Sequence, residues 1–340
     1  MQPAPNSTLS EPLRFDSLLF AKVWGGRGLA KLGKALPAAG GIGESWELAD
    51  LPQTSAGGAG GGEARSRIAT GAHSGRTLGE LIGTSGETRH GLLGSAQPSE
   101  DGGFPLLIKY LDASENLSVQ VHPSPRYARE HPECKLKTEC WYILDAAPGA
   151  VIYKGLKPGA HARLAQAIAN GSIVNDLIAV PAITGECHNL PSGTLHALGA
   201  GVLVAEVQTP SDTTFRVYDW GRTGRELHVA QALECIDAAA PPVTSRMPSG
   251  QVETRLVDTE YFTLDELYIG AGAKVEAAAH QTCDVLMVVR GGGALHDVRS
   301  KPALPMELKL GQTVLVPHYA LAHWRFVATD PTVLLRARPK

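Results

Sequence analysis

The sequence lacks a long hydrophobic run, since no segment approaches the roughly 20 consecutive apolar residues that a membrane-spanning helix requires. The first residues, MQPAPNSTLSEPLRF, also lack the basic start and apolar stretch of a secretory signal peptide. Hydrophobic residues make up 43% of the 340 residues and charged residues 19%, as in a soluble globular protein. We therefore expect a cytoplasmic protein with no membrane partner.

Cysteines and basic clusters are also sparse. The five cysteines are scattered and form no C-x-x-C pair of the kind found in zinc or redox motifs, so we expect reduced thiols. The net charge of -3 comes without a basic stripe, and aromatic residues do not alternate with basic ones as they do on surfaces that stack nucleobases. This composition argues against a nucleic-acid partner.

Short apolar runs separated by turn-forming residues dominate the chain. Residues 106–111, between Pro105 and Asp112, and residues 202–207, after Gly201, are examples. This pattern is typical of a β-sandwich or barrel. Helical periodicity is confined to a few segments, which are residues 77–82, 161–180 and 227–236.

Length and composition predict two domains. At about 150 residues per domain, 340 residues are enough for two. The segment AAAPPVTSRMPSG at 238–250 has the composition of a linker, so we expect one domain at residues 1–240 and a second at 241–340. A Gly-rich loop at 53–62 lacks the strand and the Lys-Ser/Thr pair of a phosphate-binding motif.

The segment LSVQVHP at 117–123 places two polar side chains on one face of a strand. Residues two apart point the same way in an extended chain, so Gln120 and His122 project together while Val119 and Val121 pack behind them. A lone histidine in a strand is more often a structural residue than a ligand. The strand alone therefore leaves both interpretations open.

Two further polar residues complete a candidate metal site. Glu139 begins the apolar strand KTECWYIL, and His196 ends the segment GECHNLPSGTLH. Two imidazoles, a carboxylate and an amide oxygen suit a borderline divalent cation such as zinc, with one coordination position left for water or substrate. The sequence therefore predicts a metal site made by Gln120, His122, Glu139 and His196.

The spacing around His196 resembles a known motif. Gly185, Pro191, Gly193 and His196 follow the pattern G-x5-P-x-G-x2-H, which is the second signature motif of cupin barrels. The resemblance implies a mainly β, double cupin (jelly-roll β-barrel) architecture with a few helices.

The C-terminal half repeats the cupin pattern incompletely. Gly311 and Pro317 match the start of the second motif, and His280, Asp284 and Gly291 match part of the first. The resemblance therefore implies a degenerate second barrel, in which we expect no metal. Two positions expected to hold histidine are occupied by Ala278 and Ala322.

Five sequence blocks, in order between Val23 and Arg222, resemble type I mannose-6-phosphate isomerases in their short bacterial form. The resemblance implies a zinc-dependent enzyme, with one Zn²⁺ per chain, that interconverts mannose 6-phosphate and fructose 6-phosphate through a cis-enediol. A small-molecule sugar phosphate is then its partner. The blocks are VWGGRGL with GESWEL, FPLLIKYLDA, LSVQVHP, KTECWY and LPSGTLHALGAGVLVAEVQTPSDTTFRVYDWGR.

The same resemblance implies roles for individual residues. The family's metal ligands fall on the four residues already chosen from the sequence pattern. Positions implicated in holding the phosphate match Ser118 and Arg222. The family's other active-site positions match Lys109, Lys137, Glu206 and Arg216.

Structural alternatives exist for the charged residues. Arg216 also fits a surface ion pair with Asp219, and Lys109 and Glu206 also fit solvent-facing positions of their strands. The general base is either Glu206 or Lys137, because burial can tune the pKa of a carboxylate or an amine towards neutrality.

Two other functions are compatible with a cupin scaffold. Cupins with two histidines and a carboxylate often hold redox-active iron, so a metal-dependent dioxygenase is one alternative. A non-catalytic sugar-binding or regulatory cupin is the other. The cationic residues Lys109, Lys137 and Arg216 favour a phosphorylated polyol as substrate. The sequence carries no signal for an oligomeric state.

Overall fold

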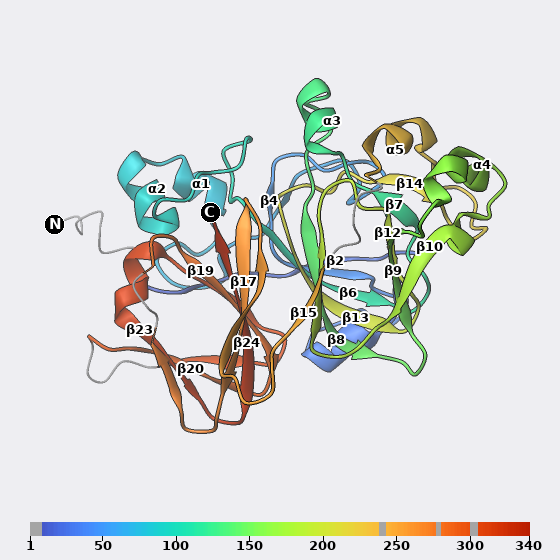
Figure 1. Cartoon of the computed structure of the whole chain (residues 1–340). Helices are drawn as coiled ribbons and strands as arrows, with labels where there is room; N and C mark the ends of the chain where they lie inside the picture. The colour runs from blue at the N-terminus through green and yellow to red at the C-terminus, as the bar shows by residue number, and fades with distance from the viewer. Residues whose placement is uncertain (1–8, 238–242, 277–279, 300–304) are drawn as a thin grey trace.

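The computed structural model describes residues 9–237, 243–276, 280–299 and 305–340. Its strands form two units side by side, the N-terminal unit on the right and the C-terminal unit on the left in Figure 1. The mainly β prediction is confirmed. Within the described residues, strand pairing stays within each sheet, so each unit is a sandwich of two open sheets. No helix in this part of the chain is long and apolar enough to cross a membrane.

The first sandwich pairs a seven-stranded sheet with a five-stranded one. In order across the larger sheet its strands are β15 (Thr244–Arg246), β11 (Glu186–Leu190), β8 (Glu139–Ala146), β13 (Val202–Gln208), β6 (Leu107–Ala113), β3 (Glu44–Leu48) and β2 (Leu18–Phe20). In order across the smaller sheet they are β10 (Leu177–Pro181), β9 (Val151–Leu156), β12 (His196–Leu198), β7 (Val119–Val121) and β14 (Phe215–Tyr218).

The second sandwich pairs a six-stranded sheet with a four-stranded one. In order, the larger sheet contains β1 (Leu13–Arg14), β22 (Thr313–Val316), β19 (Asp284–Arg290), β24 (Thr332–Pro339), β17 (Phe262–Ile269) and β16 (Glu253–Asp258). The smaller contains β18 (Lys274–Glu276), β23 (Trp324–Ala328), β20 (Gly292–Asp297) and β21 (Met306–Lys309). A separate two-stranded ribbon joins β4 (Asp50–Leu51) to β5 (Ala64–Arg65).

The helices are short and lie at the ends of the sandwiches (Figure 1). Periodicity correctly predicts helices near residues 78–82 and 229–235, but the segment 161–180 contains two 3-10 turns, one helix and a strand. The α-helices are α1 (Leu78–Ile82), α2 (Gly86–Leu93), α3 (Pro125–Glu130), α4 (Leu164–Ala169) and α5 (Val229–Cys235). The 3-10 helices are η2 (Gly28–Leu32), η3 (Ala160–Arg163), η4 (Ile173–Asp176) and η5 (His318–His323).

Two strands cross between the sandwiches. β1, near the N-terminus, pairs with β22 of the second sandwich, with Leu13 opposite Leu315. β15, which follows residue 240, pairs with β11 of the first sandwich, with Cys187 opposite Ser245. The division into domains at residues 240 and 241 stays a prediction. A strand from each side of this division pairs with the sandwich formed mainly by the other side.

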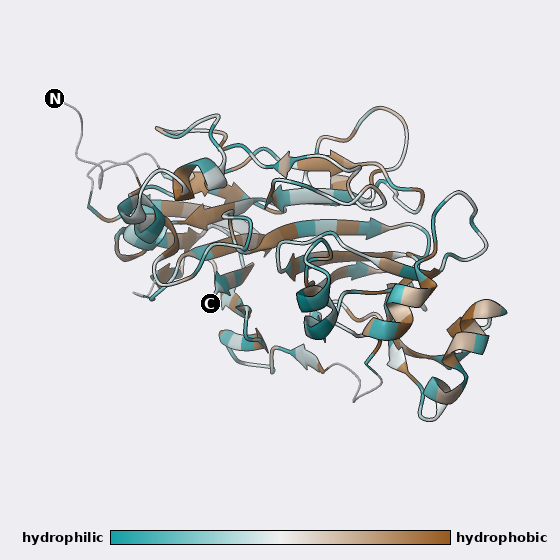
Figure 2. Ribbon diagram, turned by 90° about the horizontal axis from the view of Figure 1, so that it is seen from above, coloured by the Kyte–Doolittle hydropathy of each residue, from teal (hydrophilic) through white to brown (hydrophobic). Residues whose placement is uncertain are grey.

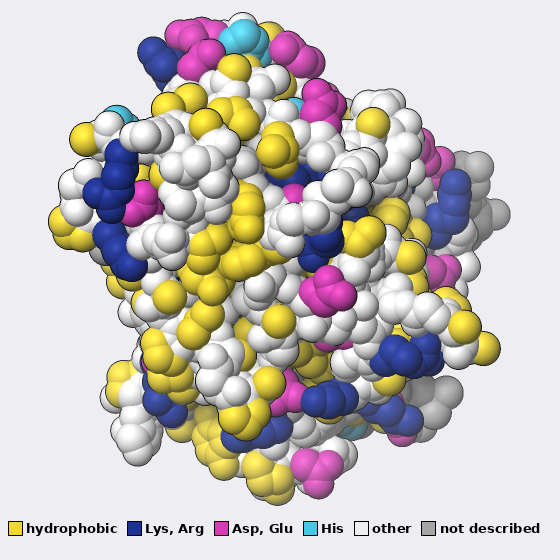
Figure 3. All heavy atoms as spheres, turned by 90° about the vertical axis from the view of Figure 1, so that its right-hand side faces the viewer, with side chains coloured by type: hydrophobic (Ala, Val, Ile, Leu, Met, Phe, Trp, Pro, Cys, Tyr) yellow, Lys and Arg dark blue, Asp and Glu magenta, His cyan; other side chains and the backbone are white. Residues whose placement is uncertain are grey.

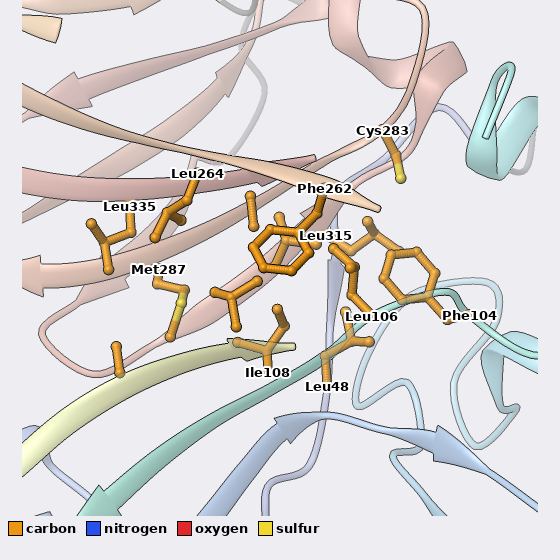
Figure 4. Packing of buried hydrophobic residues seen from close by; sticks show 14 of the residues in the cluster. Leu48, Phe104, Leu106, Ile108, Phe262, Leu264, Cys283, Met287, Leu315 and Leu335 are labelled. Atoms are coloured by element: carbon orange, nitrogen blue, oxygen red, sulfur yellow. The ribbon is translucent and has the colours of Figure 1, made fainter. Parts of the chain in front are cut away.

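A continuous hydrophobic core joins the two sandwiches. Figure 4 shows Leu106 and Ile108 of the first sandwich facing Phe262, Met287 and Leu315 of the second. The strands of both units consist mainly of hydrophobic residues in Figure 2, while hydrophilic residues colour much of the helices and loops around them. The seven-stranded sheet is therefore covered on both faces, on one side by this core and on the other by the five-stranded sheet.

The interior of the second sandwich contains buried ion pairs. Asp284, which matches the carboxylate of the first cupin motif, accepts a hydrogen bond from Arg338 Nε at 2.6 Å. Asp265 accepts from Arg336 and Arg338 at 3.2 and 3.1 Å. Ala322 lies in η5, and Ala278 lies outside the described residues. At the position of the first cupin motif's carboxylate, the charge of Asp284 is therefore balanced by an arginine.

Candidate active site

One row of polar side chains crosses the five-stranded sheet. Gln120 on β7 is directly opposite Arg216 on β14 and His196 on β12. Directly opposite residues of antiparallel strands point to the same face, so these three project into the interior of the first sandwich. His122 follows Gln120 by two residues and projects the same way.

A second row crosses the facing seven-stranded sheet. Trp141 lies opposite Glu206, Glu206 opposite Lys109, and Lys109 opposite Trp46. Glu139 precedes Trp141 by two residues and shares its face. All five side chains are buried, so the solvent-facing alternatives for Lys109 and Glu206 are wrong.

The two rows meet at three residues that surround one point. Glu139 Oε1 lies 3.2 Å from His196 Nε2, and Glu139 Oε2 lies 3.5 Å from His122 Nε2. The other ring nitrogen, Nδ1, lies 2.9 Å from the Thr213 carbonyl in His122 and 2.8 Å from the Thr194 carbonyl in His196. Since a carbonyl can only accept, each Nδ1 carries the proton and each Nε2 lone pair faces Glu139.

This cluster fits a divalent metal ion. The candidate ligand atoms of His122, Glu139 and His196 lie within 4.8 Å of one another, and no other such group occurs in the described part of the chain. His122 Nε2 and Glu139 Oε1 have no hydrogen-bond partner there, and Glu139 Oε2 has only the Lys137 ammonium group as a donor, at 2.8 Å. Buried acceptors that face one another are costly unless a cation lies between them. Two imidazoles and a carboxylate match the ligand preference of zinc.

Gln120 lies beside the cluster in a suitable position to add an amide ligand. Its Nε2 is 3.4 Å from His196 Nε2, and its Oε1 accepts a hydrogen bond from Ser118 Oγ at 3.1 Å. Exchanging the two amide atoms by rotation turns the oxygen towards the histidines. The four predicted ligands therefore converge, and Ser118 borders them.

The electrostatics of the cluster follow from its burial. Burial lowers the pKa of His122 to about 3, with help from Lys137, so the imidazole is neutral as metal ligation requires. Burial alone would raise the pKa of Glu139, but Lys137, whose Nζ lies 2.8 Å from Oε2, helps to lower it well below its usual value. Burial raises the pKa of Glu206, and the charge of Glu139 adds to this effect.

A cavity of about 230 Å³ adjoins the cluster and is lined by more cations than carboxylates. It lies in the first sandwich, whose outer face carries charged side chains of both signs with hydrophobic patches between them (Figure 3). An excess of positive charge in a concave site favours an anionic ligand. Its charged lining residues are Lys22, Lys109, Lys137, Arg216, Arg225, Glu44, Glu206 and Asp212.

Arg216 is a buried residue of this cavity. Its side chain is only 4% exposed, its Nη1 donates to the Glu226 carbonyl at 2.8 Å, and its Nε has no partner within the described residues. Asp219 instead accepts hydrogen bonds from Arg222 and Arg225. The surface ion pair considered for Arg216 is therefore not its main contact.

Arg222, which the family resemblance placed at the phosphate, and its neighbour Arg225 differ in their access to the cavity. Arg222 also donates to the Asn116 carbonyl at 2.7 Å and does not line the cavity, whereas Arg225 does. Sequence reasoning missed Arg225 and also Lys22, which lines the same cavity. No spacing signal marked either residue, since both reach the cavity through tertiary contacts.

The Gly-rich loop at 53–62 is fastened over the cavity. Its backbone N–H groups at Ser55 and Ala59 donate to the Asp212 carboxylate at 2.9 and 3.0 Å, and Lys22 Nζ donates to the Gly58 carbonyl at 2.7 Å. A side chain at Gly58 would collide with Asp212, so glycine is needed for this close approach. Asp212 precedes Thr213, whose carbonyl orients His122. The loop thus contributes to the cavity wall.

His188 is a buried histidine on β11, opposite Trp141. It is 1% exposed, and its Nδ1 lies 3.0 Å from Lys154 Nζ. Burial, together with the charge of Lys154, lowers the pKa of His188 to about 4. The histidine is therefore neutral in the folded protein at pH values where it is protonated in the unfolded chain.

This shift predicts a pH dependence of stability. Between pH 6.5 and 4 the unfolded chain binds a proton at His188 that the folded chain does not, so acid lowers the free energy of unfolding. Between pH 7.5 and 4.5 we expect the wild type to lose on the order of 2 kcal/mol more than His188→Gln. Urea unfolding at both pH values measures the difference, with exposed His161→Gln as control. Parallel pH profiles of wild type and His188→Gln would contradict the prediction.

No family model matches the chain. It is 32% identical over 329 residues to the mannose-6-phosphate isomerase of Streptococcus mutans, covering 94% of this chain and 96% of that protein. It is 32% identical over 319 residues to the mannose-6-phosphate isomerase of Bacillus subtilis, covering 91% and 94%.

Solved structures are also similar. The crystal structure of the Bacillus subtilis mannose 6-phosphate isomerase has a TM-score of 0.80 at 29% identity, covering 96% of this chain and 99% of that chain. A variant phosphomannose isomerase from Salmonella typhimurium has a TM-score of 0.75 at 17% identity, covering 97% and 99%, and shares the fold.

Proposed function

This chain belongs to the mannose-6-phosphate isomerase family, and we propose that it interconverts mannose 6-phosphate and fructose 6-phosphate at a zinc ion held by Gln120, His122, Glu139 and His196. The observation that supports the site most directly is the buried His–Glu–His cluster, whose facing acceptors adjoin a cationic cavity. We further propose one ion per chain and a cytoplasmic location.

The reaction moves a proton between C1 and C2 of the sugar, through a cis-enediol. When bound, the metal supplies Lewis-acid stabilisation of negative charge on the substrate oxygens. Arg216 lines the same cavity, and its permanent positive charge also stabilises the negative charge of the enediolate. Its buried Nε, which has no partner among the described residues, is a free donor for this purpose.

Glu206 is the candidate general base. Trp141 Nε1 donates to its Oε2 at 2.8 Å, and Lys109 Nζ lies 3.3 Å from its Oε1. These contacts fix the carboxylate at the cavity wall, and its raised pKa makes it a stronger base than an ordinary glutamate. Lys137, which is ion-paired with Glu139, is the alternative base.

The phosphate is held by the cationic part of the cavity. Arg225 and Lys22 line it, and Ser118 adds a hydroxyl group. Arg222 lies behind this wall and holds Asp219, which in turn orients Arg225. We propose that Arg222 acts on the phosphate through Arg225 rather than by direct contact.

A coupled assay with metal analysis tests this function. Purified protein is expected to contain zinc and to form fructose 6-phosphate from mannose 6-phosphate, to lose activity with a chelator, and to regain it with zinc. Activity that survives complete metal removal would contradict the metal site. Iron in place of zinc would favour the dioxygenase alternative, and no activity after metal is restored would favour a sugar-binding protein.

A further inference from the structure

A second, larger cavity lies between the two sandwiches. Its volume is about 740 Å³, and its wall includes Tyr142 of β8, the segment 246–252 between β15 and β16, and residues of β17 and β19. Tyr142 is on the opposite face of β8 from Glu139 and Trp141. The cavity is therefore separated from the proposed metal site by the seven-stranded sheet.

Two arginines give this cavity positive charge. Arg246 and Arg290 both line it, and neither forms an ion pair within the described residues. The Arg290 guanidinium group lies 5.6 Å from the centre of the Tyr268 ring, which holds it over the cavity wall. Two unpaired guanidinium groups at one cavity are a recognition site for phosphate or carboxylate.

Glu266 supplies a buried polar group at the same cavity. Its side chain is only 7% exposed, and its Oε1 accepts a hydrogen bond from the Tyr142 hydroxyl at 3.1 Å. Its Oε2 has no hydrogen-bond partner within the described residues. Burial raises the pKa of Glu266, although Arg290 and Arg246 are near enough to oppose the shift. A buried carboxyl oxygen without a partner is costly, so a hydroxyl group of a ligand would stabilise it.

We propose that this cavity binds a small phosphorylated polyol, with its phosphate on Arg246 and Arg290 and a hydroxyl group on Glu266. The charge of the two arginines, both exposed at the cavity, favours an anion, and the unpartnered oxygen of Glu266 favours a hydrogen-bond donor on the same molecule. The ligand is either the sugar phosphate of the active site at a second position or another polyol phosphate of the cell. Contact with Tyr142 places it against β8, the strand that carries Glu139.

Calorimetric titration of the full-length, metal-loaded protein with glucitol 6-phosphate, which cannot isomerise, tests the proposal. We expect two sites per chain in the wild type and one in the double variant Arg246→Ala/Arg290→Ala. Each single variant should weaken the second site about ten-fold or more, because each removes charge-assisted hydrogen bonds. The exposed Arg89→Ala variant is the matched control and should keep both sites.

The outcomes separate this proposal from the proposed function. If the wild type has one site and the double variant keeps it, the second cavity is not a binding site. The same conclusion follows if the double variant still has two sites. One wild-type site that disappears in the double variant would support it while counting against sugar-phosphate binding at the metal cluster. Inorganic phosphate serves as a second probe, and equal affinity for phosphate alone would overturn the role of the polyol and of Glu266. Mannose 6-phosphate, titrated in the same way, identifies whether the substrate itself occupies the second site.

Discussion

Replacing His122 or His196 with alanine is expected to reduce the metal content from about one ion per chain to near zero and to abolish turnover. Each imidazole has its Nε2 aimed at Glu139 by a hydrogen bond from its Nδ1 to a backbone carbonyl. Removing one ring leaves too few ligands for a site that must keep a position open for substrate. Elemental analysis and the coupled isomerase assay measure the two effects.

The control for this prediction is another buried histidine of the same sandwich. His188 is equally buried, but its ring nitrogens contact Lys154, Thr244 and Glu186 rather than the cluster. His188→Gln should therefore retain its metal. Circular dichroism checks that all variants fold. Near-normal metal content in folded His122→Ala or His196→Ala protein would refute the ligand assignment.

Replacing Arg216 with alanine is expected to lower kcat by about 10²- to 10³-fold, the range seen when one preorganised electrostatic group is lost. The metal content should stay near that of the wild type, because the Arg216 side chain donates to the Glu226 carbonyl and lines the cavity, and it donates no hydrogen bond to a proposed metal ligand among the described residues. Steady-state kinetics together with elemental analysis give both quantities.

A conservative variant distinguishes catalysis from structure at this position. Arg216→Lys keeps a positive charge and should recover part of kcat, whereas a purely structural role would depend on the hydrogen bond of the guanidinium group to Glu226. Arg89→Ala is the control for loss of an arginine elsewhere. Parallel loss of metal and activity in Arg216→Ala would make Arg216 a structural residue.

The metal site was predictable because each ligand occupies a local pattern. Gln120 and His122 are two apart in a strand, and His196 ends a motif whose spacing is visible in the sequence. Alternation in the strand then fixes the face on which a side chain lies. The register that brings Glu139 towards these residues is tertiary, so the sequence pattern proposed Glu139 as a ligand without showing where its side chain lies.

The remainder of the cavity was not predictable, because its residues are brought together by contacts between distant segments. Lys22 and Arg225 line one cavity although more than half of the chain separates them. Asp212 binds the Gly-rich loop through backbone N–H groups, which any sequence with the same backbone could offer. Composition identified that loop as loose but could not show where it docks.

The fold shows the same division between local and distant information. Apolar runs located most of the buried strands, whereas α2 and α3 were missed because their sequences, GETRHGLL and PRYARE, are mostly polar and show no clear apolar stripe. They begin at the serine caps Ser85 and Ser124, whose hydroxyl groups accept hydrogen bonds from the first turn. The pairing of β1 with β22 joins segments at opposite ends of the chain, which a local pattern cannot reveal.

Because each sandwich holds an edge strand that comes from the other half of the chain, neither half is complete without the other. Cutting the polypeptide near residue 240 would remove an edge strand from each unit and would expose the hydrophobic core shown in Figure 4. We expect the separated fragments to aggregate, so the N-terminal fragment would not be an active minimal enzyme. We therefore expect the C-terminal unit to be needed for the first sandwich to fold, although it contributes no residue to the proposed metal site.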